Sequence, residues 1–376
     1  MKKVVIIFLA AVFMLAMYVP VSAEDWNIYG SARVQTFWTD FDEELDSDFA
    51  DTTQLGHEMN VVSRFGMMVD HGIVGGHFEA GFRGGGAAGG GTVYHRHLYG
   101  TVDMPFGQLL VGQTWKPYGL GSFISSQAYA HDEGGPYFIG YGHRAPMIQL
   151  TVGDFKIALV EPNTAALTNE DPVWAQGDDP DEDEPINNAA DTDRELFLPQ
   201  INLSYNMMVA DGIALHFAGA FQTYDLEAPG QDWDGETLNA FGVTANARFT
   251  MMDPMYFNIG GFYGLNHALI DPTYNPVLPV LAGDEIVDVD SFGVLLAVGT
   301  KVNNIGLELG FGYREDEYDD ADDADELMLV YANANIPLSP DGNAFIVPEI
   351  GYYDYESGGD DAGDKMYAGL KWQINF

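Results

Sequence analysis

The sequence has no cysteine among its 376 residues, and it has few basic residues. Disulfides, thiolate nucleophiles and a lipid-bearing cysteine are therefore excluded. Fifteen lysines and arginines stand against 57 aspartates and glutamates, so the formal net charge is −42. Such a chain would repel the phosphates of nucleic acids, and no nucleic-acid partner is expected. Aromatic residues make up 13% of the chain and hydrophobic residues 47%, which is too much for a disordered acidic protein.

Motifs that carry catalysis are also missing. The chain contains no GxSxG nucleophile turn and no HExxH metal-protease motif. Two glycine triplets, 84–86 and 89–91, are not followed by Lys-Ser or Lys-Thr, so they predict a flexible connection and not a phosphate-binding loop. The sequence therefore predicts neither an enzyme nor a cofactor.

Long hydrophobic runs are confined to the first residues. Lys2 and Lys3 precede an apolar run from Val4 to Tyr18, and Val21-Ser22-Ala23 follows it. This order predicts a secretory signal peptide, 1–23, cleaved before a single domain of residues 24–376. Beyond Glu24 no stretch reaches the roughly 20 apolar residues of a spanning helix, so a helical membrane protein is excluded. Membrane-crossing strands need only about 9–11 residues each and remain possible.

The last residues alternate with a period of two. One side of an extended strand would carry Met366, Ala368, Leu370, Trp372, Ile374 and Phe376. The other side would carry Lys365, Tyr367, Gly369, Lys371, Gln373 and Asn375. Alternating side chains of a strand face opposite sides of the sheet. This pattern suits the closing strand of a transmembrane barrel, with lipid on one side and a watery lumen on the other. A strand of a soluble sandwich is the alternative.

Short and long connectors alternate along the chain. The short ones are Asp70-His71-Gly72, Pro105-Phe106-Gly107, Gly153-Asp154, Ala210-Asp211-Gly212, Met252-Asp253-Pro254, Asn303-Asn304 and Pro340-Asp341-Gly342. The long, mostly acidic ones are Asp40 to Gly56, Glu161 to Arg194, Glu227 to Glu236, Asp271 to Asp290, Glu315 to Asp325 and Ser357 to Asp364. An outer-membrane barrel has short periplasmic turns and long external loops, so this alternation favours one.

Between the connectors lie about sixteen predicted strands. They are 26–39, 58–70, 73–83, 93–104, 108–115, 145–152, 155–160, 195–208, 213–226, 237–250, 256–268, 291–302, 305–318, 326–337, 344–356 and 364–376. Their polar faces carry amides, glycines and isolated charges, which a packed core would not tolerate unpaired. The predicted fold is all-β: a closed antiparallel transmembrane barrel with an open aqueous interior.

One segment carries a family resemblance. Residues 98–117 read LYGTVDMPFGQLLVGQTWKP, which resembles Gram-negative outer-membrane porins at Gly100, Phe106-Gly107 and Gly112-Gln113. The terminal Phe376 fits the same pattern. The resemblance implies a sixteen-stranded, usually trimeric diffusion channel, surrounded by outer-membrane lipid and lipopolysaccharide. Porins often have a basic residue after the glycine that matches Gly112, and because Gln113 stands there, the family's arginine ladder does not transfer directly.

The resemblance also implies a third external loop that folds into the lumen. On this count that loop is Tyr118 to Arg144, rich in glycine, serine and aromatic residues. Its apolar side chains would be poorly placed in open water, and inward folding would cover them; they are Phe123, Ile124, Tyr137, Phe138 and Ile139. A loop that contacts a neighbouring subunit, or closes as a lid, is the alternative.

Candidate pore-lining residues come from both sides of this lumen. Alternation places Arg33, Arg64 and Arg83 on a basic inner wall, and Asp132 and Glu133 on the inward loop would face it. Opposed charges across a narrow passage create a transverse field that favours polar solutes. His97 and Lys371 complete the predicted pore lining. Alternatively, the arginines pair with lumen acids such as Glu79 and Glu308.

Metal sites are weakly indicated. His77, His95 and His97 could face the lumen close to Glu79, but a zinc or nickel site needs further ligands, and wall histidines are more often solvated. The acidic runs 178–184 and 319–326 lack the spacing of a calcium loop. They would hold Ca²⁺ or Mg²⁺ loosely and link the external loops to lipopolysaccharide.

These observations lead to one functional hypothesis and two alternatives. The hypothesis is an outer-membrane porin for passive diffusion of small hydrophilic solutes and ions. The alternatives are a channel selective for small organic anions, and a structural or adhesive barrel. Small residues on the lipid face, such as Ala332 and Ala334, would allow the close packing of a homotrimer.

Overall fold

The computed structural model describes residues 26–42, 53–84, 91–119, 142–163, 193–227, 235–271, 277–282, 285–319, 321 and 323–376. Several predictions fall wholly or partly outside these ranges. They are the signal peptide, the glycine triplets, the body of the third connector with Asp132 and Glu133, and the acidic runs 178–184 and 319–326.

Strands account for most of the described residues. The first half of the chain contains β1 (Trp26–Phe41), β2 (Thr53–Met59), β3 (Ser63–His71), β4 (Val74–Arg83), β5 (Thr92–Met104), β6 (Gly107–Trp115), β7 (Arg144–Val152), β8 (Phe155–Val160), β9 (Asp193–Glu195) and β10 (Gln200–Ala210). The second half contains β11 (Ile213–Glu227), β12 (Thr237–Met252), β13 (Met255–Leu265), α3 (His267–Ile270), β14 (Val280–Ala282), β15 (Glu285–Val287), β16 (Val289–Val302), β17 (Ile305–Tyr318), β18 (Asp325–Pro337), β19 (Ala344–Ser357) and β20 (Asp360–Asn375). Within these residues, no helix is long and apolar enough to cross a membrane.

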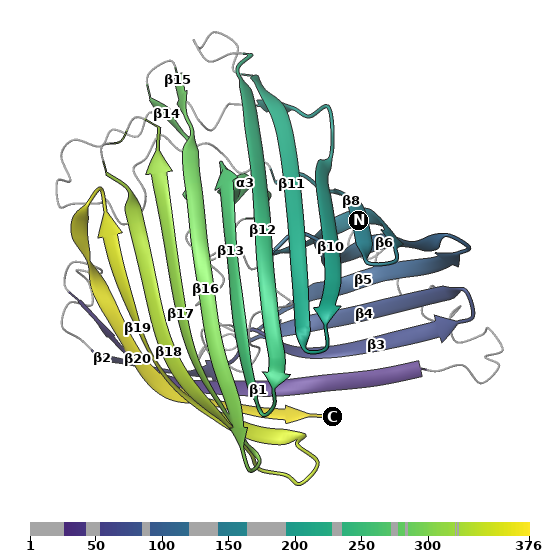
Figure 1. Ribbon diagram of the computed structural model, residues 1–376, viewed down its shortest axis with the longest axis vertical. Coiled ribbons are helices and arrows are strands. Elements are labelled where there is room, and N and C mark those ends of the chain that lie inside the picture. Colours follow the sequence, from purple (N-terminus) through teal and green to yellow (C-terminus); the bar gives the residue numbers. More distant parts are fainter. Residues whose placement is uncertain are drawn as a thin grey trace.

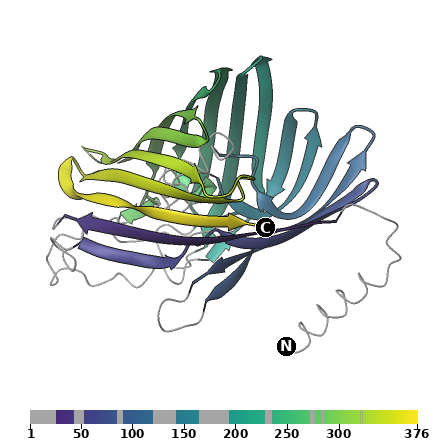
Figure 2. The same cartoon turned by 90° about the horizontal axis from the view of Figure 1, so that it is seen from below.

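Antiparallel pairing runs along the chain and closes on itself. Each wall strand pairs with the next, and the last strand β20 pairs with β1, where Val34 lies opposite Trp372 (Figure 1). Viewed along a second direction, the purple β1 and yellow β20 again lie side by side (Figure 2). The described strands therefore form a closed antiparallel barrel, as the sequence predicts. Closure leaves no unpaired sheet edge, which a membrane would not tolerate.

The eighteen strands of the barrel sheet occupy sixteen positions around the wall, because two positions are each shared by two strands. Within the described residues, β2 and β3 both pair with β1, and β9 and β10 both lie between β8 and β11. The sequence predicts strands at 58–70 and 195–208 and places most of β2 and β9 in the connectors before them, which is wrong. Asn60 makes a turn between β2 and β3, accepting a hydrogen bond from the Val62 amide. Pro199, which has no amide hydrogen to offer a neighbour, lies between β9 and β10.

Side-chain burial is inverted relative to a water-soluble protein. On β20, Trp372 is 45% exposed on the outer face, while its neighbour Lys371 is fully buried on the inner face. The same alternation recurs around the wall, with exposed Val111, Ile148 and Phe217 outside. Apolar side chains thus cover the outside of the barrel and polar ones line the inside. An apolar exterior of this extent suits a lipid environment.

Tyrosine–glycine pairs shape the inner face. Tyr29 lies across Gly66 and Tyr256 lies across Gly299, each directly opposite on the neighbouring strand. Tyr331 and Tyr367 lie across Gly310 and Gly351 in the same way. A Cβ atom on any of these glycines would collide with the ring. Glycine at these positions therefore lets the ring lie flat on the sheet, so that its hydroxyl reaches a carboxylate beyond it.

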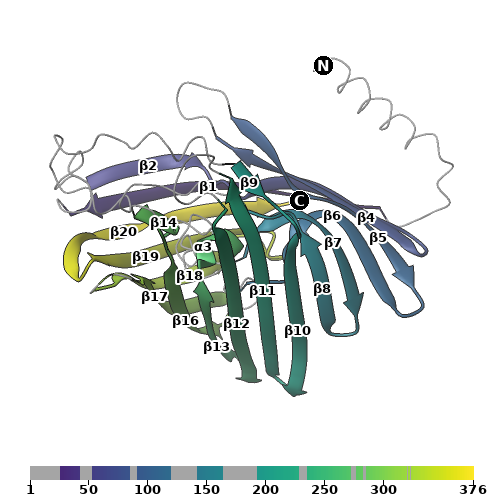
Figure 3. The same ribbon diagram turned by 90° about the horizontal axis from the view of Figure 1, so that it is seen from above.

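Two connectors differ from their predictions. β13 ends at Leu265 instead of Ala268, because Asn266 adopts a left-handed conformation (φ 48°) and the short helix α3 follows. Figure 3 shows α3 inside the ring of strands. The predicted long connector of residues 357–364 is a tight turn at Gly358 and Gly359, both with positive φ. Such turns are favoured by glycine and let β20 begin at Asp360.

Candidate functional site

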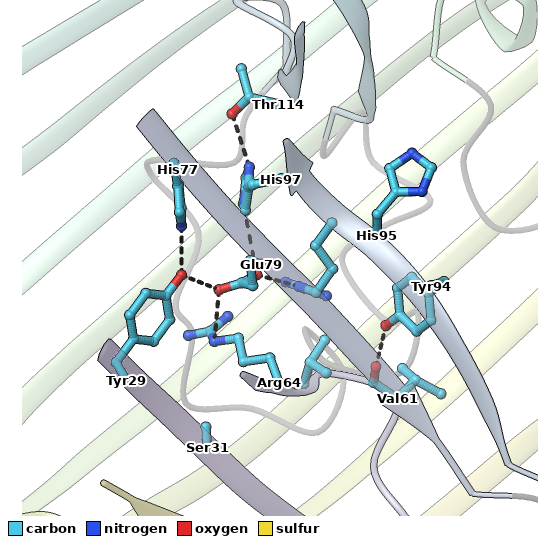
Figure 4. Close-up of polar contacts among 12 residues, drawn as sticks. Tyr29, Ser31, Val61, Arg64, His77, Glu79, Tyr94, His95, His97 and Thr114 are labelled. Carbon is cyan, nitrogen blue, oxygen red and sulfur yellow. Dashed lines mark hydrogen bonds and ion pairs between the residues drawn. The ribbon is translucent and has the colours of Figure 1, made fainter. Parts of the chain in front are cut away.

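A polar cluster lies on the inner face of β1 and β3–β6. Its centre is Glu79 on β4, which lies opposite Gly66 of β3 and His97 of β5 (Figure 4). Because Gly66 has no side chain, Tyr29 of β1 reaches over it and donates to Glu79 Oε2 at 2.7 Å. The register of three strands thus brings an aromatic hydroxyl and a carboxylate together.

Two arginines pair with the Glu79 carboxylate. Arg96 Nε donates to Oε1 at 2.6 Å, and Arg64 Nε lies 3.5 Å from Oε2. Glu79 is only 3% exposed, and a charge buried so deeply needs such partners. Of the predicted wall arginines, Arg64 therefore pairs with a lumen acid, as the alternative expects, and Arg96 joins it at Glu79.

Two stacked histidines border the carboxylate. The rings of His77 and His97 are 4.8 Å apart and nearly parallel. His77 Nε2 lies 2.6 Å from the Tyr29 hydroxyl, and His97 Nδ1 lies 3.0 Å from Thr114 Oγ1. In the described part of the chain, no three histidine or acidic side chains are arranged to hold one metal ion. The stacked pair is therefore part of a hydrogen-bonded wall.

A β-bulge decides which residues of β5 face inward. The register shifts between Glu79 and Ala80, which pair with His97 and His95, so Arg96 is the extra residue. Arg96 and His97 are both buried as a result, although they are consecutive. The expectation that His95 could face the lumen is wrong: His95 is exposed, bonds Gln113 Oε1 at 2.7 Å and points away from Glu79 (Figure 4). Bulges re-aim side chains in this way and break simple alternation.

The other predicted pore-lining residues lie in different surroundings. Arg33 is buried on β1 beside the cluster, and its Nε donates to Ser31 Oγ at 3.0 Å. Lys371 is fully buried on the inner face of β20, next to β1. Arg83 is exposed at the end of β4. Asp132 and Glu133 lie outside the described residues, so the opposed pair of charges stays a prediction.

Two arginines share one carboxylate in this wall, since Arg64 and Arg96 both pair with Glu79, and Arg33 is buried nearby. Elsewhere on the inner face, carboxylates accept hydrogen bonds from tyrosines: Glu308 accepts from Tyr256 and Tyr331, and Glu349 from Tyr367. The transverse field across the passage stays a prediction.

Both described ends of the third connector are tied to α3. Lys116, just after β6, donates through Nζ to the Ile270 carbonyl, and the Tyr118 hydroxyl lies 2.7 Å from His267 Nε2. At the other end, the Gly142 amide donates to Asp271 Oδ2 at 2.8 Å, and His143 Nδ1 lies 3.2 Å from Oδ1. We call these contacts between the connector ends and residues 267–271 the α3 clamp.

Burial sets the protonation of the clamp. Burial lowers the pKa of His267 to about 3, which keeps the ring neutral at pH 7. Burial alone would raise the pKa of Asp271, but the His143 hydrogen bond and the charge of Lys116 lower it to about 2. The pKa of Lys116 is lowered by burial, against the opposing attraction of Asp271. The clamp therefore rests on a charged carboxylate and a neutral imidazole.

Sequence reasoning missed several of these groups. It did not single out Arg96, Tyr29 or Asp271 as functional candidates. The local sequence around Arg96 has no signal for the bulge, since no glycine or proline marks it. Asp271 was placed in an acidic external loop, and only the contacts with Gly142 and His143 reveal its internal position.

Comparisons with known proteins bear on the fold. No protein-family model matches the chain, and no curated protein matches it. Solved structures do. The outer-membrane channel DcaP of Acinetobacter baumannii is 16% identical with a TM-score of 0.67, covering 95% of this chain and 99% of that one.

Two further solved structures are similar. The anion-selective porin from Comamonas acidovorans is 11% identical with a TM-score of 0.56, covering 94% of this chain and 100% of that one. Salmonella typhi OmpF, in complex with daunomycin, is 12% identical with a TM-score of 0.55, covering 93% and 98%. At such low identity the likeness concerns the fold alone. This chain folds as a closed sixteen-stranded antiparallel barrel similar to those of outer-membrane channels.

Proposed function

We propose that the protein is an outer-membrane porin through which small hydrophilic solutes and ions diffuse passively. One observation carries the proposal: a closed barrel with apolar side chains outside and buried charges and amides inside. A soluble protein would place these residue types the other way round. A sixteen-stranded barrel is also wide enough for an aqueous passage. The likeness to DcaP and OmpF supports the same function.

The proposal is tested by reconstituting the purified protein in a planar lipid bilayer. A large conductance that rises linearly with voltage, together with entry of small sugars into liposomes, is the expected result. Folded protein that inserts without conducting would contradict it and favour a structural or adhesive barrel.

The third connector is proposed to narrow the passage. Its described ends enter the barrel, because Tyr118 packs so closely on Gly242 of β12 that a Cβ there would collide with its hydroxyl. Deleting 123–138 should therefore raise conductance and admit larger sugars. A shortened protein with unchanged conductance and unchanged sugar entry would place the body of the connector elsewhere.

A second candidate is a channel that prefers small organic anions. The excess of arginine over carboxylate around Glu79 favours it, since a basic wall attracts anions in a confined passage. Conductance that saturates with an anionic solute would support this candidate. Conductance that stays proportional to concentration would support general diffusion.

We also propose a homotrimer in outer-membrane lipid, in contact with lipopolysaccharide. Ala332 and Ala334 lie on the outer face of β18, between the buried Tyr331 and Asn333, where small side chains permit close approach of another subunit. Light scattering in mild detergent should give three copies, and a monomer would contradict the proposal. The proposal includes no cofactor and no enzymatic activity. Ca²⁺ or Mg²⁺ bound loosely at the acidic connectors remains part of it.

A further inference from the structure

A second polar region lies inside the barrel and is separated from the Glu79 cluster by Trp115, whose ring lies 6.4 Å from that of His97. It is a cavity of about 350 Å³ between the ends of the third connector and the wall strands β8, β10 and β11. The wall contributes Lys156, Ser204, Asn206 and His216, and the end of β6 with the start and end of the connector contributes residues 115–119 and Gly142. We call these four wall residues the β8–β11 patch.

Strand register places the four side chains of the patch next to one another on three neighbouring strands. Lys156 of β8 lies directly opposite Ser204 of β10, and Asn206 lies directly opposite His216 of β11. Directly opposite side chains on antiparallel strands have Cβ atoms about 4.5–5.5 Å apart. Ser204 and Asn206 face the same side, since they are two residues apart on one strand. All four side chains can therefore approach one small molecule together.

The patch is rich in donors. Lysine offers three N–H groups, asparagine two and serine one O–H group, whereas the His216 ring is already hydrogen-bonded to Asn246. No carboxylate is among the described residues that line the cavity. Lys156 forms no ion pair with any described residue. Arg144 adds positive charge at the edge, where its guanidinium lies 4.2 Å from the Trp115 ring.

Buried polar atoms beside the patch have no protein partner. On β12, Thr244 lies opposite Ala218 and Asn246 opposite His216, and both are only 4% exposed. Thr244 Oγ1 and Asn246 Oδ1 lack any hydrogen bond within the described structure. Buried polar atoms are nearly always satisfied by protein, water or ligand. The Thr244 hydroxyl can donate to a solute oxygen, whereas Asn246 Oδ1 can only accept.

We propose that this cavity binds small oxyanions, carboxylates or phosphates, during passage through the barrel. Lys156 supplies the opposite charge, and Ser204 and Asn206 donate hydrogen bonds to the oxygens, while His216 forms part of the wall, hydrogen-bonded to Asn246. Cations are repelled by Lys156, and neutral solutes leave its charge uncompensated. The inference rests on the proposed channel function and adds to it a site for solute, separate from the arginines around Glu79.

The test uses the full-length protein in a planar bilayer bathed in potassium chloride. Inorganic phosphate is added in one arm and acetate in another. A saturable decrease in single-channel current is expected in at least one arm, and the responding arm identifies the chemistry. Lys156→Gln should raise the half-blocking concentration about tenfold or more, because a charge-assisted hydrogen bond is lost. Lys156→Arg should retain the block.

The control variant is Lys301→Gln, which removes an exposed lysine at the end of β16. It should leave the block unchanged. Equilibrium dialysis of phosphate and acetate against the detergent-solubilised protein measures binding without conduction, so a channel that fails to conduct does not hide the site. Conduction without saturable block in either arm, or equal weakening by Lys156→Gln and Lys301→Gln, would overturn the proposal. If the protein does not conduct but binds an anion in dialysis, and Lys156→Gln loses that binding, the binding site is supported and the channel function is rejected.

Discussion

Glu79 shows how a single inner-wall residue organises its surroundings. Its two oxygens accept hydrogen bonds from Arg96 and Tyr29, and the Nε of Arg64 lies 3.5 Å from one of them. Taking these charges out of water costs several kcal/mol for each ion, and only the mutual pairing offsets that cost. The pairing therefore stabilises the arginines inside the barrel, and in the proposed channel they would act on passing ions.

Glu79→Gln should shift the zero-current potential toward anions, since it removes the negative charge of the cluster. It should also lower the free energy of unfolding by about 3 kcal/mol, because Arg64 and Arg96 lose a buried partner. Adding Arg96→Gln to Glu79→Gln should restore part of that stability. Thermal unfolding in detergent and bilayer recordings under a salt gradient measure both effects. A double variant less stable than either single one would contradict the pairing.

Arg33→Gln and Arg83→Gln should differ in their effect on ion selectivity. Arg33 is buried within the wall, whereas Arg83 is exposed at a strand end. Charge at an exposed site is screened over about 10 Å at 0.1 M salt, and charge at a buried site is screened much less. Arg33→Gln should therefore shift the zero-current potential clearly toward cations, and Arg83→Gln only slightly. Equal shifts from the two variants would show that Arg33 does not line the narrow part of the passage.

Connectors act at the scale of whole elements. The α3 clamp joins segments far apart in sequence, since Tyr118 meets His267 and Gly142 meets Asp271. Asn163 also donates to the Ala268 carbonyl, which ties the following connector to α3. A four-residue helix is too short to be stable alone, so these contacts hold it in place.

Asp271→Ala should release the downstream end of the third connector. It removes the acceptor of the Gly142 amide, and hydrogen bonds to a charged group each contribute about 1.5–3 kcal/mol. Amide hydrogen exchange at Gly142 should accelerate at least tenfold, and current recordings should become noisier. Asp211→Ala, in a short turn on the surface, serves as the control. Unchanged protection of Gly142 would show that the clamp does not hold the connector.

Acid should weaken the same clamp. The pKa of His267 is lowered to about 3 from an ordinary 6.5. Between pH 6.5 and pH 3 the unfolded state therefore binds more protons than the folded clamp, and the stability of the clamp falls as pH falls. Asp271, with its pKa lowered to about 2, contributes stability above its ordinary value of 3.8 and loses it as pH falls toward 2. Both His267 and Asp271 therefore make the clamp less stable as pH falls. Protection of Gly142, corrected for intrinsic exchange, should therefore fall between pH 7 and pH 3, and protection that rises would contradict this.

At the scale of the molecule, the acidic excess sets the surroundings of the passage. Exposed acids lie at both ends of the barrel. At the end with the long connectors they include Asp319, Asp323, Asp360 and Asp361, and in the short turns at the other end they include Asp154, Asp211 and Asp341. These charges should concentrate cations at both entrances. The arginines of the interior act in the opposite direction, so selectivity should be moderate.

Cation preference should therefore decrease as salt increases. The screening length falls from about 30 Å at 0.01 M to about 3 Å at 1 M, which removes the influence of the exposed acids. Zero-current potentials under equal concentration ratios at low and high salt measure this. Converting Asp319, Asp323, Asp360 and Asp361 to asparagine should reduce the salt dependence. An unchanged dependence in that variant would show that these four acids do not set it.

The sequence by itself determined the barrel. Alternation along segments such as 305–318, bounded by short turns and acidic connectors, requires one face in lipid and one in water. Period-two patterning is a local property of each strand, and closure follows because an open edge cannot be satisfied in a membrane. The inner positions of Arg33, Arg64 and Lys371 follow from the same pattern.

Only the tertiary structure decided which charges meet. The bulge at Arg96 turns the Arg96 side chain inward and the His95 side chain outward, opposite to simple alternation. It arises from the pairing of β4 with β5, which the sequence of neither strand predicts by itself. The clamp at Asp271 and the patch around Lys156 each join elements whose contacts depend on the register of several strands and on how the connectors enter the barrel. Sequence periodicity assigns a side chain to a face, but its neighbours on that face come from other strands, and only folding brings them together.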